Sequence, residues 1–501
     1  MTGLPHPLAG AVEWILVVIV VAGAVPEVVA AWQFLLAAVH GWRNHYAACQ
    51  PVLPRTAVLI PAWNEGAVLA ASIDRLMAAD YPPGALRVYV IDDASTDDTP
   101  QLVGAKEAQY PGRVVHLRRE RGGQGKAHTL NHGLAVVLAD DWMQALLITD
   151  ADVIFEPATL RRMTRHLADP AVGAVTAYIK EGSRPGNYLT RFIGYEYITA
   201  QAGARRGQNV LHAVACLAGG AQLHSRANLA ALGGRIDATS LAEDTVTTFE
   251  TQLHGRRVVF EPHATCWAEE PGSIASLWKQ RSRWARGNVQ VTARYRRVWF
   301  RQPFARRGRP HQLGGITFGL TWFCLLLQPV FMISSSAALL TLYFAGSPNA
   351  WPAFRVLWVT NAATYLFITG FALLMDPQTA RHTWRQGVLF PGLVNLAIIV
   401  ESCFPEVVRA VGNATHLSGR HAPWITVFSY AWLGASLAVG YLVKVTASLP
   451  RGRLVSALLL YLVGYGSLLC ACTFASYVKE LRRADMRWEK TEKTGKVTIP
   501  T

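Results

Sequence analysis

Three side chains near residue 280 share the spacing of one helical face. Gln280, Arg283 and Trp284 stand at positions i, i+3 and i+4, so a helix would present an amide, a guanidinium and a large flat ring together. A guanidinium suits a phosphate and an aromatic ring suits a sugar, so the trio could hold a nucleotide-sugar beside a second sugar. The same pattern also fits an amphipathic helix that lies on a membrane with its arginines toward the headgroups. This stretch alone does not decide between the two interpretations.

Three short apolar runs in the first third of the chain each end in acidic or polar residues. These ends are residues 61–65, 92–95 and 150–152. The runs alternate with helical stretches as βαβ units do, and in open α/β sheets a ligand sits beyond the carboxyl ends of the strands. Carboxylates that recur at that edge therefore indicate a site, whereas one such cluster alone would more often be a turn or a helix cap.

Asp150 and Asp152 are two residues apart, so at the end of a strand their side chains point the same way. Two convergent carboxylates with a diphosphate make a Mg2+ or Mn2+ site, because magnesium takes few protein ligands and keeps substrate phosphates and waters. The alternative is a surface Asx turn. The apolar run that leads into Asp150 favours the metal site.

Two further motifs could serve the same chemistry. Residues 122–126 form a glycine-rich turn without the Walker pattern; Lys126 could present a cation to a diphosphate, and a flexible exposed loop fits equally well. Glu243 and Asp244 open a stretch with helical spacing, where helix capping alone would explain them. If the domain handles a donor sugar, a carboxylate must accept the proton of the attacking hydroxyl. Asp244 is the candidate, but spacing alone does not choose it over Glu243.

The elements that must position these residues follow from a division of the chain. Of its 501 residues 51% are hydrophobic, and between two apolar regions residues 43–312 are mixed, charged and long enough for one soluble domain. We predict that this domain, with an interfacial helix near 273–290, is inserted between transmembrane helices. The first of these lacks a basic n-region and a clear cleavage site, so we interpret it as a retained anchor. The predicted spans are 12–38, 316–343, 355–375, 423–446 and 453–477.

Lysines and arginines set the expected orientation in a cell membrane. The tail at 478–501 and the end of the soluble domain are both basic, so we place both in the cytoplasm and the N-terminus outside. Two basic flanks on one side need an even number of spans between them, which four spans satisfy if 386–411 is an interfacial or re-entrant segment. Whether 386–403 spans the membrane stays open, and the tail after Trp488 is expected to be disordered. The basic residues counted are Arg296, Arg297, Arg301, Arg306, Arg307 and Arg309 in the domain, and Lys479, Arg482, Arg483, Arg487, Lys490, Lys493 and Lys496 in the tail.

The net charge of +15 raises the question of nucleic-acid binding. Much of the basic excess stands at the membrane-proximal flanks, which indicates anionic lipid headgroups as partners, and we find no nucleic-acid motif. The seven cysteines show neither metal-ligand nor disulfide spacing.

The order of four motifs resembles a known family. Residues 92–95, 150–152, 243–244 and 280–284, taken together within one domain, are similar to the membrane-embedded family 2 glycosyltransferases, which include the cellulose, hyaluronan, chitin-oligosaccharide and poly-N-acetylglucosamine synthases. The resemblance covers roughly residues 55–290, and the run from Phe260 to Arg281 looks closest to the poly-N-acetylglucosamine synthases. Two departures are mild: Ala94 and Ser95 stand where many members have Gly-Ser, and Trp63 where many have Tyr.

The resemblance implies a GT-A fold, an α/β Rossmann-like cytoplasmic domain, with Mg2+ or Mn2+ as cofactor and inversion at the anomeric carbon. It also implies a role for each matching position. These roles are nucleotide contacts for Pro61, Trp63, Glu65 and Asp92, proximity to the donor for Lys126, metal and diphosphate binding for Asp150 and Asp152, the catalytic base for Asp244, diphosphate binding for Gln280 and Arg283, and stacking under the acceptor sugar for Trp284.

The implied reaction transfers a sugar, with N-acetylglucosamine favoured, from a UDP-sugar to a growing β-linked polysaccharide that is exported across the membrane. A non-processive enzyme that adds one sugar to a membrane lipid acceptor would use the same motifs. A non-catalytic transporter or scaffold would not need the carboxylates and Arg283 together. The sequence leaves the sugar, the linkage, the product length and any accessory subunits undetermined.

Overall fold

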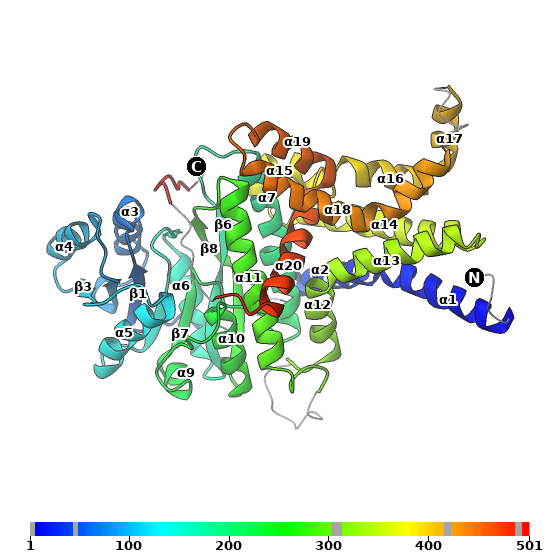
Figure 1. Ribbon diagram of the computed structural model, residues 1–501. Helices are drawn as coiled ribbons and strands as arrows, with labels where there is room; N and C mark the ends of the chain where they lie inside the picture. The colour runs from blue at the N-terminus through cyan, green and yellow to red at the C-terminus, as the bar shows by residue number, and fades with distance from the viewer. Residues whose placement is uncertain (1–5, 44–48, 302–312, 415–421, 486–492, 500–501) are drawn as a thin grey trace. The chain divides into compact units, whose positions relative to one another are not determined.

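The computed structural model of the chain describes residues 6–43, 49–301, 313–414, 422–485 and 493–499 (Figure 1). These residues divide into two compact units, which are described separately. We call them the helical unit and the sheet unit. The helical unit comprises Met1–Phe34, Leu277–Arg286 and Leu320–Ala484, and the sheet unit comprises Leu35–Ser276, Gly287–Gly319 and Asp485–Thr501.

A mixed sheet forms the centre of the sheet unit, with the order β3-β2-β1-β4-β7-β6-β8-β5 among the described residues. The four strands from β3 to β4 are parallel, β7 runs antiparallel to both of its neighbours, β6 and β8 are parallel, and β5 is antiparallel to β8. The strands are β1 (Thr56–Ala62), β2 (Leu86–Asp92), β3 (Val114–Arg118), β4 (Ala145–Ile148), β5 (Ile154–Phe155), β6 (Val172–Glu181), β7 (Gln222–Ser225) and β8 (Arg257–Ala268).

The apolar runs form buried strands because helices cover the sheet. Strands β1, β2 and β4 are buried along almost their whole length, as expected for parallel strands covered on both faces. Helix α5 packs on β1 and β2, where a Cβ on Gly133 would lie 2.8 Å from the Ile91 side chain. The helices of this unit are α3 (Gly66–Met77), α4 (Thr99–Gln109), α5 (Lys126–Ala139), α6 (Thr159–Thr164), α7 (Tyr188–Tyr197), α8 (Ala204–Val210), α9 (Arg226–Ala231) and α10 (Glu243–Leu253).

The part of helix α11 (Ile274–Arg294) that belongs to the sheet unit supports helix α10. The side-chain oxygen of Gln290 accepts a hydrogen bond from Leu241 N (3.1 Å), and the Tyr295 hydroxyl donates to Glu250 (2.5 Å). A Cβ on Gly287 would lie 2.6 Å from the Cβ of Ala242, so the helix passes close to the residue before α10. These contacts fix the segment that carries Glu243 and Asp244.

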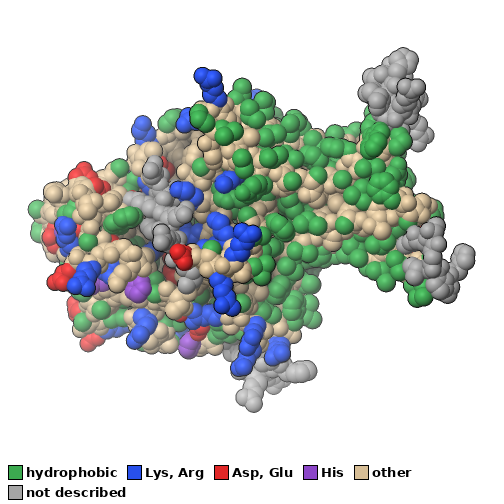
Figure 2. Space-filling view, in the orientation of Figure 1, with side chains coloured by type: hydrophobic (Ala, Val, Ile, Leu, Met, Phe, Trp, Pro, Cys, Tyr) green, Lys and Arg blue, Asp and Glu red, His purple; other side chains and the backbone are tan. Residues whose placement is uncertain are grey.

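Apolar helices make up the helical unit, and Figure 2 shows hydrophobic side chains spread over its surface, whereas charged side chains gather on the sheet unit. Among the described residues, three helical segments are each long and apolar enough to cross a membrane: Leu8–Trp42, Ala350–Met375 and Pro423–Ala447. The helices are α1 (His6–Ala22), α2 (Val25–Trp42, continuing into the sheet unit), α12 (Ile316–Leu326), α13 (Gln328–Phe344), α14 (Ala350–Met375), α15 (Pro377–Val388), α16 (Leu393–Cys403), α17 (Pro405–Ala414), α18 (Ala422–Ala447), α19 (Arg453–Val463) and α20 (Tyr465–Leu481).

Two stretches that we expected to be single spans are each broken into two helices. Residues 316–343 form α12 and α13 with a bend of 69°, and residues 453–477 form α19 and α20 with a bend of 101°. Residues 386–403, which we left open, lie in α15 and α16, bent by 71°. Gly392 and Gly464 have positive φ angles at two of the breaks, and a Cβ on Gly392 would lie 2.4 Å from Gly464 N. The two breaks therefore meet backbone to backbone, where only glycine fits.

Several residues used for the orientation lie outside the described residues. They are Arg306, Arg307, Arg309, Arg487 and Lys490. The orientation of the spans accordingly stays a prediction.

Candidate active site

The three polar clusters predicted from the sequence meet at one edge of the sheet. Strand β1 lies between β2 and β4, and all three are parallel, so their carboxyl ends point the same way. Ala62 pairs with Asp92, and Leu59 pairs with Ile148, two residues before Asp150. Pro61, Trp63 and Glu65, at the end of β1, therefore lie at the same edge as Asp92, Asp150 and Asp152.

Asp92 is buried at this edge with one oxygen unsatisfied. Its Oδ1 accepts a hydrogen bond from Ser95 N (2.8 Å). Its Oδ2 lies 3.5 Å from His116 Nε2 and 3.7 Å from Arg118 Nε but has no hydrogen-bond partner in the described part of the chain. A buried acceptor without a partner is costly, and a donor group of a ligand, such as the N–H of a nucleobase, would satisfy it.

The loops after β1 and β2 are tied together. Asn64 N donates to Ser95 Oγ (2.9 Å), and Asn64 Oδ1 accepts from Thr96 N (2.8 Å). Glu65 N donates to Thr99 Oγ1 (2.9 Å). The side chain of Trp63 is 39% exposed beside this connection. A flat ring is therefore available at the edge of the sheet next to Asp92.

The glycine-rich turn places Lys126 at the first position of α5. A Cβ on Gly122 would lie 2.0 Å from Asp93 O, and Gly125 has a φ of 102°, so this path of the chain requires glycine. Lys126 Nζ donates to Asp150 Oδ1 at 2.5 Å. Burial lowers the pKa of the Lys126 ammonium, but the carboxylates of Asp150, Glu243 and Asp244 outweigh burial, and the pKa is raised. Lys126 is therefore a permanent cation among carboxylates.

Gly219, in the segment before β7, marks the point where these groups converge. A Cβ on Gly219 would lie 3.2 Å from Lys126 Nζ, 3.6 Å from Asp244 Oδ2 and 3.9 Å from Asp150 Oδ2. The sequence did not choose between Glu243 and Asp244. An Asp244 oxygen lies near the same point as the Asp150 carboxylate, and the charge of Glu243 also acts on Lys126, so the role of Asp244 stays a prediction.

Arg205 also belongs to this neighbourhood, although the sequence analysis did not single it out. It lies on α8, directly after the π-helix Ile198–Gly203, and donates to Gln201 Oε1 (3.2 Å). Burial lowers the pKa of its guanidinium, while the charge of Asp244 opposes this effect. π-Helical turns often occur at functional sites. The π-helix before Arg205 is a feature of the backbone that the sequence pattern does not reveal, and it draws attention to this residue.

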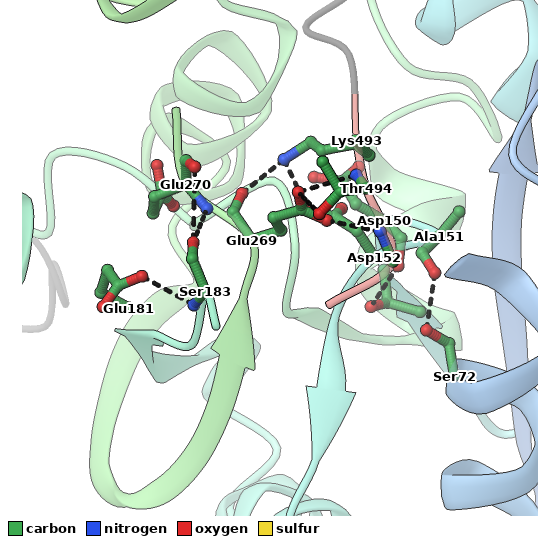
Figure 3. A network of polar contacts seen from close by, with 12 residues as sticks. Ser72, Asp150, Ala151, Asp152, Glu181, Ser183, Glu269, Glu270, Lys493 and Thr494 are labelled. Atoms are coloured by element: carbon green, nitrogen blue, oxygen red, sulfur yellow. Dashed lines mark hydrogen bonds and ion pairs between the residues drawn. The ribbon is translucent and has the colours of Figure 1, made fainter. Parts of the chain in front are cut away.

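Asp152 is held from two sides, as Figure 3 shows. Ser72 Oγ on α3 donates to Ala151 O (2.6 Å), which fixes the Asp150–Asp152 turn. Lys493 Nζ, from the C-terminal tail, donates to Asp152 Oδ2 at 2.6 Å. We expected the tail after Trp488 to be disordered, but its residues 493–499 are described and bound to the sheet unit. The pattern of the tail gave no signal for this contact, because neither helical nor strand periodicity is present.

A divalent cation fits the two aspartates only with help from a substrate. Among the described residues no group of three His, Cys, Asp or Glu side chains is arranged to hold a metal ion. Asp150 and Asp152 supply two carboxylates, which is the usual protein share of a magnesium site whose other ligands are phosphate and water oxygens. The lysines paired with both aspartates show that this position attracts cations. The residues present therefore fit a metal–diphosphate group.

Gln280, Arg283 and Trp284 lie on the part of α11 that belongs to the helical unit. Trp284 is 37% exposed, and the guanidinium of Arg281 lies 4.1 Å from the centre of its ring. Arg281 also donates to Gln280 Oε1 (2.5 Å). The opposite face of the helix is anchored within the same unit by Ser282, whose Oγ lies 3.2 Å from Cys472 Sγ. The predicted trio is thus presented on one accessible helical face.

Comparisons with known proteins bear on the family and the fold of this region. Residues 54–287 match the family described as "Glycosyltransferase like family 2". This region is therefore similar to the family 2 glycosyltransferases. A mannosyltransferase from Pyrobaculum calidifontis, solved in complex with GDP-Man and Mn2+, is 24% identical with a TM-score of 0.50, covering 76% of this chain and 99% of that one. That similarity establishes the GT-A fold of the glycosyltransferase domain, as predicted.

Three curated relatives match about half of this chain. The probable glycosyltransferase YdaM of Bacillus subtilis is 32% identical over 50% of this chain and 59% of its own length. The beta-monoglucosyldiacylglycerol synthase of Synechocystis is 30% identical over 49% and 50%. The poly-beta-1,6-N-acetyl-D-glucosamine synthase of Staphylococcus aureus is 27% identical over 47% and 55%. The chain thus aligns with little more than half the length of these relatives, through its glycosyltransferase domain.

Proposed function

We propose that the protein is an inverting, metal-dependent glycosyltransferase that extends a β-linked polysaccharide with sugars from a UDP-sugar, N-acetylglucosamine being the favoured sugar. The observation that carries the proposal is the convergence of Lys126, Asp150 and Asp244 around Gly219. A cation, a carboxylate for a metal and a second carboxylate to accept a proton, all at one point, are what transfer from a diphosphate to a hydroxyl requires.

In this proposal the donor lies along the carboxyl edge of the sheet. The unsatisfied Oδ2 of Asp92 accepts a hydrogen bond from the uracil, and Pro61, Trp63 and Glu65 line the nucleotide. Asp150 and Asp152 hold Mg2+ or Mn2+ together with the diphosphate, and Lys126 lies beside them. When bound, the metal neutralises the charge that grows on the departing UDP.

Asp244 acts as the catalytic base. Its carboxylate takes the proton of the acceptor hydroxyl while that oxygen attacks the anomeric carbon from the side opposite the diphosphate. The bond from carbon to the β-phosphate oxygen breaks, and UDP leaves with the electron pair. A single in-line displacement converts an α-linked donor into a β-glycoside. Water must be kept from the same carbon, and a bound acceptor sugar achieves this by occupying its place.

The helical face of α11 would bind both substrates. Gln280 and Arg283 are proposed to hold the diphosphate, because a guanidinium forms paired hydrogen bonds to phosphate oxygens. The ring of Trp284 is proposed to stack under the acceptor sugar and to orient it for transfer.

The membrane setting is part of the proposal. The helices long enough to span a membrane support a multi-pass protein of the cell membrane, with the glycosyltransferase domain and C-terminus in the cytoplasm. Synthesis beside the spans would allow the growing glycan to leave across the membrane, alone or with accessory subunits. Membrane lipids would contact the exposed apolar residues of the helical unit, such as Leu366, Leu374 and Leu454.

A lipid acceptor is the second candidate, favoured by the similarity to the beta-monoglucosyldiacylglycerol synthase. Product size separates the two. Purified protein in detergent, with Mn2+ and a panel of radiolabelled UDP-sugars, should give a glycan ladder or polymer that a linkage-specific glycosidase degrades. A product limited to one sugar on an added diacylglycerol would reject the polymerase and support the lipid enzyme.

A further inference from the structure

The end of the chain pairs with the end of strand β6. Arg184 N donates to Lys496 O (2.7 Å), and Thr498 N donates to Gly182 O (3.2 Å). Ser183 and Val497 form an antiparallel bridge between these two hydrogen bonds. A Cβ on Gly182 would lie 2.8 Å from Val497 Cγ1, so glycine at this position lets the tail approach. Residues 493–499 therefore add to the sheet unit as an extended peptide does in β-augmentation.

The side chain of Glu269 binds the tail mainly through backbone N–H groups of the tail. Glu269 as a residue is only 6% exposed, and its carboxylate accepts hydrogen bonds from Thr494 N (2.8 Å), Thr494 Oγ1 (2.8 Å) and Gly495 N (3.0 Å). In the described part of the chain these are all of its hydrogen bonds to donors. Because a buried carboxylate needs such donors, Glu269 is satisfied by the tail itself.

Gly495 makes this contact specific. Its φ is 75°, and a Cβ at this position would lie 2.2 Å from Ala67 O in α3. Any other residue would clash with backbone and strain the turn. Residues 493–498 are therefore matched to one surface, which we call the tail-binding surface. Asp152, Glu269 and Ala67 contact residues 493–495, and residues 182–184 contact residues 496–498.

The tail brings its lysine to a proposed metal ligand. Lys493 Nζ donates to Asp152 Oδ2 (2.6 Å) and to Glu269 O (2.5 Å), and Figure 3 shows the ammonium between these two groups. An ammonium ion and a divalent cation that both contact Asp152 would repel each other strongly at such distances. A divalent cation that binds Oδ2 of Asp152 must therefore displace Lys493, whereas at Asp150 the metal would use Oδ2 while Lys126 holds Oδ1.

We propose that residues 493–499 are an internal competitor of the metal–donor complex, which docks on the tail-binding surface and occupies Asp152 with Lys493. The proposal rests on the proposed function only in taking Asp152 as a metal ligand. Binding of the cation with the donor diphosphate displaces Lys493, and loss of that contact loosens the rest of the tail. In the free enzyme Lys493 therefore blocks Asp152 until the cation and the donor bind together.

The first test measures Mn2+ binding to the full-length protein in the presence of UDP, by the electron paramagnetic resonance signal of free Mn2+. Lys493→Gln should bind Mn2+ roughly tenfold more tightly than the unchanged protein, because a competing charge-assisted hydrogen bond is gone. Gly495→Ala should also tighten binding, since it displaces the tail while keeping the lysine. Lys496→Gln is the matched control: it removes the same charge from an exposed side chain of the same tail and should change nothing.

The second test follows the tail directly by hydrogen–deuterium exchange. The amides of Thr494, Gly495 and Thr498 should exchange slowly in the free protein and faster once Mn2+ and UDP are added. Equal or weaker Mn2+ binding by folded Lys493→Gln would overturn the proposal, as would a tail that stays protected while Mn2+ is bound. If neither the unchanged protein nor the variants bind Mn2+ with UDP, the metal site of the proposed function fails as well. The two failures are therefore distinguishable.

Discussion

Lys126 and Asp150 form a part-buried ion pair at 2.5 Å, although 24 residues separate them in the chain. The pair joins the glycine-rich turn to the aspartate motif and places a fixed cation beside the proposed diphosphate position. Without Lys126, the carboxylates of Asp150 and Asp244 would face each other without a cation between them, and the donor would lose a charged partner.

Replacement of this lysine tests the pair. Lys126→Met should lower the rate of sugar transfer by about a hundredfold, because a preorganised charge at the leaving group is lost. Lys106→Met is the control, since Lys106 forms a similar pair with Asp74 (2.6 Å) between α4 and α3. Initial rates with saturating UDP-sugar measure both. Equal losses in the two variants would show that the effect is one of folding rather than catalysis.

Gly219 tests whether the point of convergence is where the substrates react. Gly219→Ala adds a methyl group at 3.2–3.9 Å from Lys126, Asp244 and Asp150, and only the end of the flexible Lys126 side chain, at 3.2 Å, must shift slightly to admit it. We expect a melting temperature close to that of the unchanged protein and a loss of kcat/KM of about tenfold or more, because the methyl group competes with the reacting sugar for space. Gly104→Ala, where nothing lies within 4 Å, should leave activity intact. Full activity of Gly219→Ala would show that the substrates do not react at this position.

Substitutions on the face of α11 that carries Arg283 and Trp284 should affect UDP affinity and transfer rate differently. Trp284→Ala removes the stacking surface but leaves the diphosphate ligands, so UDP affinity should survive while transfer to the acceptor falls by about a hundredfold. Arg283→Ala should weaken UDP affinity and transfer together. Calorimetry with UDP and transfer rates measure both quantities. If α11 is instead only a membrane-surface helix, both substitutions will have small and similar effects, and this account of the helix is wrong.

Glu181, at the end of β6 beside the tail, predicts a pH dependence of stability. Burial raises the pKa of its carboxyl group to about 7, against hydrogen bonds from Ser183 that lower it. Because the folded-state pKa lies above the unfolded value, ionisation opposes folding: the cost is absent below the unfolded pKa, grows as the pH rises toward 7 and is complete above it.

Glu181→Gln removes this cost. The variant should therefore gain stability over the unchanged protein as the pH rises from 5 to 8, by about 2–3 kcal/mol across that range. Thermal unfolding at pH 5, 6, 7 and 8 gives the comparison, with Glu120→Gln at an exposed position as control. A difference that shrinks as the pH rises would contradict the burial of an ionising Glu181.

The sequence predicted the parts of the site that follow from local pattern. Asp92 and Asp150 follow apolar runs, and because parallel strands end at the same edge of a sheet, their proximity could be inferred without coordinates. The helical spacing of Gln280 and Trp284 likewise placed them on one face of α11. Periodicity and strand direction are local properties, so both can be inferred from residues that are close together in the sequence.

The remaining features depend on contacts between distant segments. Lys493 meets Asp152 across 341 residues, and nothing in the tail's own pattern indicates its partner. The proximity of Asp244 to Asp150 becomes visible only at Gly219, and the break at Gly464 depends on the backbone of Gly392 that faces it. The hydropathy of a segment depends only on how many apolar residues it contains and does not reveal a bend within it. We therefore expected residues 453–477 to form one helix.

The most direct test of the proposed function is UDP release by the purified protein and its Asp244→Asn variant, with UDP-N-acetylglucosamine first among a panel of UDP-sugars, in Mn2+ and an acceptor glycan. We predict steady UDP release coupled to glycan growth in the unchanged protein. In Asp244→Asn we predict a loss of at least about a hundredfold, with Mn2+ and UDP still bound, because only the proton acceptor is missing. Transfer by Asp244→Asn at a near-normal rate, or no UDP release by the unchanged protein with any UDP-sugar, would contradict the account.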